Sequence, residues 1–139
     1  SLHDIEEGDA VVTQEGLVGY VSAVGVNYAQ VVGIIDMTSK VAAMISRTRE
    51  TVVAEGSFEL LDEGLMRVSY LKNDSDVRQG DLVETSGYGG IYPKGLLIGR
   101  VLEVLPESHG ISSYAIIEPV VDFSTLTHVF VVKDYEVVE

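Results

Sequence analysis

A serine in a glycine-rich turn is the residue of this 139-residue chain that comes closest to a catalytic nucleophile. Ser86 precedes Gly87, and a turn of this kind can aim backbone N–H groups at an oxyanion. A serine hydrolase also needs a histidine held by a carboxylate, and the available ones are His3 in a terminal tail, His109 in a turn and His128 among strand residues. The Gly-Asp-Ser-Gly run typical of serine proteases is absent from the sequence. A two-barrel serine hydrolase is therefore kept as an alternative, and we expect no catalytic residues.

Oxygen ligands for a cation are grouped at one place, the run Asn73-Asp74-Ser75-Asp76. This run lacks the central glycine and the twelfth-position glutamate of a calcium-binding loop. A turn in which these side chains bond nearby backbone is the favoured interpretation. The absence of Cys excludes disulfides, thiolate zinc sites and a cysteine nucleophile. We therefore expect no metal and no cofactor.

An irregular loop brings together aromatic side chains that could bind a partner. Residues 85–96 include four glycines and one proline, yet the loop also carries Tyr88, Ile91 and Tyr92. Solvated loops usually lack such side chains. Either they close the mouth of a barrel, or they form an interaction surface, where Tyr is favoured. A glycan-binding module is a further alternative, with Tyr88 and Tyr92 as its aromatic platform.

The composition predicts which elements must position these residues. Val, Ile and Thr make up more than a quarter of the chain, and β-branched residues suit strands. The formal net charge is −13, which argues against nucleic acid and anionic membrane surfaces as partners. Four basic residues nevertheless fall close together in the sequence: Lys40, Arg47, Arg49 and Arg67. They form either a positive strip toward a partner or a chance cluster.

An internal repeat is the clearest feature of the chain. Residues 4–13 match residues 76–85 at a constant offset of 72, so that Gly8-Asp9 corresponds to Gly80-Asp81. In each pair the glycine supplies a turn position with positive φ, and the aspartate can bond nearby backbone. A second matching block in each half contains Gly19 and Gly99. A glycine inside a strand indicates a bend, a bulge or a close backbone approach.

Strands are predicted at residues 30–35, 41–46, 51–54, 65–70, 112–118 and 127–133, with a turn near 124–127. Many short strands bounded by turn residues predict closed antiparallel barrels, which leave no exposed strand edges. The prediction is an all-β chain with two small antiparallel barrels, the first in residues 1–72 and the second in residues 73–139. The boundary is soft, because a terminal strand can cross to the other barrel.

The segment 85–101 resembles the signature of the rod shape-determining protein MreC family. Residues 16–21 and 34–41 are also similar to that family, and the resemblance covers nearly the whole chain. We predict structural roles for the glycines, aspartates and proline of the signature and repeat: Gly8, Asp9, Gly19, Gly80, Asp81, Gly87, Gly89, Gly90, Pro93, Gly95 and Gly99. Tyr88 stands where the family often has a small or aliphatic residue.

The resemblance implies two six-stranded barrels of chymotrypsin-like architecture without a catalytic site. It implies a membrane protein anchored by a helix upstream of this chain, with the present region on the extracytoplasmic side. The implied function is a noncatalytic scaffold that organises bacterial cell-wall elongation and maintains cell shape, through self-association. The implied partners are MreB, MreD and a class B penicillin-binding transpeptidase.

Overall fold

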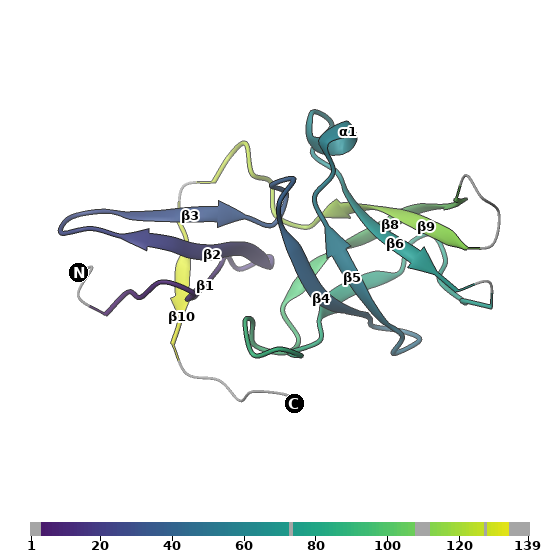
Figure 1. Cartoon of the computed structure of the whole chain (residues 1–139), viewed down its shortest axis with the longest axis horizontal. Coiled ribbons are helices and arrows are strands. Elements are labelled where there is room, and N and C mark those ends of the chain that lie inside the picture. Colours follow the sequence, from purple (N-terminus) through teal and green to yellow (C-terminus); the bar gives the residue numbers. More distant parts are fainter. Residues whose placement is uncertain (1–3, 73, 108–111, 127, 134–139) are drawn as a thin grey trace.

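The computed structural model describes residues 4–72, 74–107, 112–126 and 128–133, which form strands and one short helix (Figure 1). The elements are β1 (Ala10–Val12), β2 (Leu17–Val24), β3 (Ala29–Gly33), β4 (Lys40–Ile45), β5 (Thr51–Glu55), α1 (Phe58–Leu61), β6 (Met66–Leu71), β7 (Leu82–Thr85), β8 (Leu97–Pro106), β9 (Ser113–Pro119) and β10 (Phe130–Val132). The predicted all-β class is confirmed. No helix in this part of the chain is long and apolar enough to cross a membrane.

The strands form one closed barrel and one open sheet, which lie side by side in Figure 1. The barrel closes in the order β4-β5-β6-β9-β8-β7, and the four-stranded sheet has the order β10-β1-β2-β3. Every pairing in both is antiparallel. One six-stranded barrel is therefore confirmed. The second predicted barrel and the chymotrypsin-like arrangement are not confirmed, because the described residues of the other region form a sheet with two edges.

The predicted boundary after residue 72 does not separate the two regions. β4, β5 and β6 precede it in sequence but lie in the barrel with β7, β8 and β9. β10 returns to the sheet and pairs with β1 through Val131 and Val11, which is the kind of crossing that the soft boundary left open. The prediction was wrong because each repeat begins a three-stranded unit whose fourth strand comes from elsewhere in the chain.

The two repeats fold into equivalent three-stranded units, β1-β2-β3 and β7-β8-β9. Val11 pairs with Gly19 in the first unit, and Val83 pairs with Gly99 in the second. A register shift follows Val11 and Val83 alike. β10 lies beside β1 as β4 lies beside β7. The sequence repeat is thus a structural repeat, and β5 and β6 are the strands that close only the second unit into a barrel.

A shared hydrophobic core joins the barrel to the sheet. Buried side chains from the barrel strands, among them Ile45, Met66 and Ile98, belong to one cluster with Leu17 and Ile34 of the sheet region. A smaller cluster lies on the other face of the sheet and consists of Val11, Val18, Val21 and Val121. Alternation along the strand sends neighbouring side chains to opposite faces. The sheet is therefore packed against the barrel, and the glycine-rich loop contributes to the shared core through Tyr92.

Candidate functional site

The glycine-rich loop between β7 and β8 is fastened at its base by Thr85. The buried Thr85 hydroxyl donates a hydrogen bond to the Pro93 carbonyl oxygen at 2.6 Å and accepts one from the Leu96 N–H at 2.8 Å. The Thr85 backbone also donates to the Leu96 carbonyl at 2.8 Å and accepts from the Gly95 N–H at 2.9 Å. These four hydrogen bonds join Thr85, at the start of the loop, to residues 93–96 at its end. The residues between them are therefore held in a defined position relative to the barrel.

Several glycines of this loop adopt left-handed backbone conformations, which set the path of the chain on both sides of Tyr88. Gly87 and Gly89 flank Tyr88 with φ of 81° and 80°, a conformation that favours glycine. Gly90 and Gly95 also have positive φ. Gly99 acts differently, since a Cβ there would lie 2.5 Å from the Glu118 carbonyl oxygen. Positive φ and close backbone approach are therefore the physical reasons for proposing structural roles for these glycines.

The three apolar side chains of the loop differ in how far they are buried. Tyr92 is 7% exposed, whereas Tyr88 is 50% and Ile91 59% exposed. The two interpretations left open by the sequence therefore apply to different residues. Tyr92 closes the shared core and is not available to a partner, so its prediction as a surface residue is wrong. Tyr88 and Ile91, called the loop tip from here on, remain the candidate interaction surface.

Tyr92 anchors the loop at the junction of barrel and sheet. It lines a pocket of about 330 Å³ together with Tyr20, Lys40 and Ile91. Burial raises the pKa of Tyr92 to about 12, with a smaller contribution from Tyr20. The phenol thus stays neutral at physiological pH. An aromatic platform made of Tyr88 and Tyr92 does not form, because only Tyr88 is on the surface.

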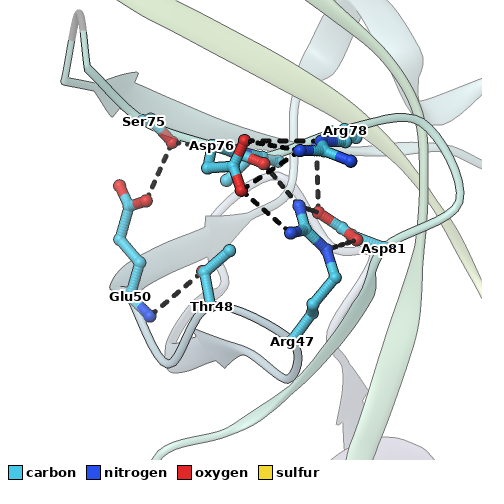
Figure 2. A network of polar contacts seen from close by, with 8 residues as sticks. Arg47, Thr48, Glu50, Ser75, Asp76, Arg78 and Asp81 are labelled. Atoms are coloured by element: carbon cyan, nitrogen blue, oxygen red, sulfur yellow. Dashed lines mark hydrogen bonds and ion pairs between the residues drawn. The ribbon is translucent and has the colours of Figure 1, made fainter.

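A charged cluster, called the barrel clasp, holds the turn before β7 and consists of Asp81, Arg47, Asp76 and Arg78 (Figure 2). Arg47 donates from Nε and Nη2 to the two carboxylate oxygens of Asp81 at 2.8 and 3.0 Å. Its Nη1 donates to Asp76 at 2.9 Å. Asp81 also accepts the Arg78 backbone N–H at 2.8 Å. The hydrogen bonds from Arg47 lower the pKa of Asp81 and, together with those from Arg78, that of Asp76.

The sheet has an equivalent contact, called the sheet clasp, between Asp9 and Lys133 at 2.8 Å. Asp9 accepts the Glu6 backbone N–H at 2.9 Å, as Asp81 accepts that of Arg78. Burial alone raises the pKa of Asp9, but the hydrogen bonds from Lys133 and Glu6 outweigh it and the pKa is lowered. Each clasp joins a Gly-Asp turn to a cation just beyond the neighbouring strand. Lys133 directly follows β10 in the sheet, and Arg47 follows Ser46 after β4 in the barrel.

The predicted glycines of these turns also behave alike. Gly8 and Gly80 have φ of 91° and 92°. The Gly8 N–H donates to Val21 O at 2.7 Å, and the Gly80 N–H donates to Val101 O at 2.8 Å. The pairing of Arg47 and Lys133 with these aspartates was not predicted, because the two cations lie at unrelated distances in sequence from the turns. Only the strand register brings each cation to its turn.

Ser86 is placed as a structural residue of the loop. It is buried, its N–H donates to the Ala42 carbonyl at 3.0 Å, and its Oγ accepts the Tyr88 N–H at 3.2 Å. Of the histidines considered with it, His3 and His109 lie outside the described residues, while His128 is exposed beside β10. The contacts of Ser86 therefore fasten the loop to β4 and orient Tyr88.

The possible cation-binding run is used for other contacts. Asn73 lies outside the described residues, Ser75 Oγ donates to Glu50 at 2.8 Å, and Asp76 belongs to the barrel clasp. Over the described part of the chain, no group of three or more His, Asp or Glu side chains is placed to hold a metal ion. Of the two aspartates of this run, Asp76 is paired with arginine, and Asp74 is exposed.

The hypothesis of a uniform positive strip on the first half of the chain is wrong for two of its four residues. Arg47 is engaged by two aspartates. Arg67 pairs with Glu107 at 2.7 Å and lies over the Tyr114 ring at 4.0 Å from the centroid. Lys40 and Arg49 are exposed on separate parts of β4 and its following turn. Strand geometry divides a cluster that is compact only in sequence.

Fold and loop place the chain among small all-β proteins in which a closed barrel is joined to an antiparallel sheet. The family described as "Rod shape-determining protein MreC, barrel core" matches residues 1–133, and the chain belongs to this family. Cell shape-determining protein MreC of Bacillus subtilis (strain 168) is 33% identical over 134 residues, which cover 90% of this chain and 46% of that protein. The chain thus spans about half the length of the curated relatives it matches.

Solved structures of the family share the fold. MreC from Pseudomonas aeruginosa superposes with a TM-score of 0.87 at 23% identity, over 95% of this chain and 83% of that one. A complex between penicillin-binding protein PBP2 and MreC from Helicobacter pylori matches with a TM-score of 0.73 at 18% identity, over 94% of this chain and 82% of that one. At these identities the likeness establishes the fold.

Proposed function

We propose that this chain is the extracytoplasmic part of a noncatalytic scaffold that organises bacterial cell-wall elongation and maintains cell shape. The proposal combines membership of the MreC family with the description of the relatives as cell shape-determining proteins. In the whole protein, a helix upstream of the present residues would anchor the scaffold in the membrane. The scaffold would hold its partners in position by surface contacts.

The observation that carries the proposal is the rigid presentation of the loop tip. Tyr88 and Ile91 are exposed, while Thr85 fixes the loop through hydrogen bonds and Tyr92 fixes it through burial in the core. Interface energy is concentrated in a few anchors, often aromatic, and rigid anchors lose little entropy on binding. A loop of this design is suited to contact with another protein surface.

The partners we propose are a class B penicillin-binding transpeptidase, MreB, MreD and a second copy of the protein. The complex of PBP2 with MreC in Helicobacter pylori supports the transpeptidase. MreB, MreD and self-association rest on the family. The signature residues would act indirectly, by holding the loop and both Gly-Asp turns in place.

The contacts of the loop favour this scaffold over the two alternatives. A hydrolase needs a nucleophile that is activated by a base, whereas Ser86 is buried and accepts a backbone hydrogen bond. A glycan-binding module needs an exposed aromatic platform, and the burial of Tyr92 removes half of the candidate one. The proposed protein would therefore act by binding partners at its surface.

Complementation in cells tests the proposal. The full-length protein carrying Tyr88→Ala and Ile91→Ala replaces the chromosomal copy, and cell width and length are measured. Tyr28→Ala is the matched control, because Tyr28 is also about half exposed, at 54%, but lies between β2 and β3. We expect misshapen cells for the loop variant and normal cells for the control. Normal cells with a stably produced loop variant would contradict the proposal.

A further inference from the structure

A groove of about 790 Å³ lies between the α1 region and the segment that follows β9. Its apolar lining includes Ile35, Pro119, Val120 and Phe123. Phe123 packs against both hydrophobic clusters, so this side of the groove is supported by the core. Figure 1 shows α1 standing out from the barrel. The groove and the loop tip have no lining residue in common.

The charged residues of the groove all have one sign. Asp62, Glu63, Glu118 and Asp122 line it and are exposed, and none of its lining residues is Lys, Arg or His. Apolar surface edged by carboxylates is complementary to a partner that combines aliphatic or aromatic side chains with positive charge.

The short helix beside the groove has apolar surface that the described residues leave uncovered. α1 contains no buried residue, and its preceding Ser57 makes no side-chain capping hydrogen bond. Phe58 is 76% and Leu61 38% exposed, and Leu61 lines the groove. Single exposed apolar residues are common, but here they adjoin a groove with an apolar lining.

We propose that this groove binds a peptide segment of a partner protein in which Lys or Arg alternates with apolar side chains. The inference rests on the proposed scaffold function and adds to it a second binding site with a stated partner chemistry. A second copy of this chain is disfavoured as the occupant, because it also has a net charge of −13 and would bring like charges together.

Two acidic residues are suitable for testing the charge. Asp62 and Glu63 follow α1 and are exposed. Glu118 is less suitable because it is the cross-strand partner of Arg100, and Asp122 accepts hydrogen bonds from the Ser124 N–H and hydroxyl at 3.0 and 2.6 Å. Asp62→Asn with Glu63→Gln therefore removes two charges from the turn that follows α1 and leaves Glu118 and Asp122 unchanged.

The experiment is a fluorescence anisotropy titration of a short labelled peptide of alternating lysine and leucine, at about physiological ionic strength. The D62N/E63Q variant and Leu61→Ser are each expected to bind about fivefold more weakly. The matched control is Glu7→Gln with Glu103→Gln, which removes the same charge from exposed positions outside the groove. A peptide of alternating lysine and glycine should bind more weakly than the leucine peptide, because it lacks apolar side chains.

NMR chemical shift mapping locates the bound peptide. We expect the largest shifts at residues 61–64 and 118–124. Equal weakening by the control variant, or shifts spread over the whole acidic surface, would overturn the inference, as would no binding by the unmodified chain. Those outcomes leave the scaffold function standing, because it is tested through the loop tip. Conversely, groove binding that persists while the loop variant leaves cell shape normal would contradict only the scaffold function.

Discussion

The barrel and the open sheet start from equivalent hairpins and differ in what surrounds them. The third strand of the barrel unit, β9, is paired on both sides, whereas the equivalent strand of the sheet unit, β3, is an edge. The barrel clasp uses two arginines, one of them bidentate, and two aspartates, whereas the sheet clasp uses one lysine and one aspartate. The same local sequence pattern is thus placed in a more constrained region and a less constrained one.

The two copies of the repeated unit have separate roles because only one of them is closed into a barrel. Closure by β5 and β6 lets the barrel carry an irregular loop with an exposed tip, because the base of the loop is fixed on a closed structure. The corresponding connection in the sheet, residues 13–16, is short. Stability and partner binding are therefore expected to respond differently to equivalent changes in the two regions.

The largest effect is expected from valine at the equivalent strand glycines. A Cβ at Gly99 would lie 2.5 Å from Glu118 O, and one at Gly19 would lie 1.9 Å from Val32 O. Gly99→Val should cost about 3 kcal/mol, since β9 is held on both sides by other barrel strands. Gly19→Val should cost about 1–2 kcal/mol, because the edge strand β3 can shift away. Urea unfolding followed by circular dichroism measures both values.

Hydrogen exchange on the same two variants shows where the loss occurs. Gly19→Val should loosen the sheet and leave the barrel amides protected, while Gly99→Val should loosen the barrel. An equal free-energy loss in both variants, despite the different surroundings, would show that closure does not constrain the barrel more than the sheet.

An intermediate effect is expected from neutralising the clasp aspartates. Asp81→Asn weakens charge-assisted bonds to Arg47 and to the Arg78 backbone, and should lower the free energy of unfolding by about 2 kcal/mol. Asp9→Asn affects fewer charge-assisted bonds and should cost about 1 kcal/mol. Thermal or urea unfolding of both variants measures the order, and a larger loss for Asp9→Asn would contradict the comparison.

The smallest effect is a pH dependence of stability that comes from the clasp aspartates. The pKa values of Asp81, Asp76 and Asp9 are lowered in the folded chain. Their stabilisation is therefore present above the ordinary carboxyl pKa and is lost as the pH falls through the lowered folded values, that is, below about pH 4. Urea midpoints between about pH 6 and pH 3 should fall less steeply for Asp81→Asn than for the unmodified chain. Parallel profiles would show that Asp81 does not contribute.

Local features of the fold could be predicted from the sequence because they depend on nearby residues. Gly8-Asp9 and Gly80-Asp81 favour a turn with positive φ through their own residue types, and the structure shows the same hydrogen bonds in both. Strands rich in Val and Ile were also located to within a few residues. The pairing of β4 with β7 and of β10 with β1 depends on contacts between distant segments, which no single sequence pattern specifies.

The candidate site could be predicted only in part, because it also depends on contacts between distant segments. The loop composition indicated apolar side chains with a special role, but Ile91 and Tyr92 are neighbours with opposite exposure. Which of them is buried depends on how the sheet packs beside the barrel. The groove beside α1 could not be predicted, because it joins residues near 62 and 122 and the short helix has no periodic pattern.

The central claim is that the loop tip binds a partner while Tyr92 supports the fold. The most direct test measures, on the same variants of the full-length protein, affinity for a class B transpeptidase and the melting temperature. Tyr88→Ala should weaken binding about 30-fold, which corresponds to about 2 kcal/mol, with an unchanged melting temperature. Tyr92→Ala should lower the melting temperature. Unchanged affinity in a folded variant carrying both Tyr88→Ala and Ile91→Ala would contradict the account.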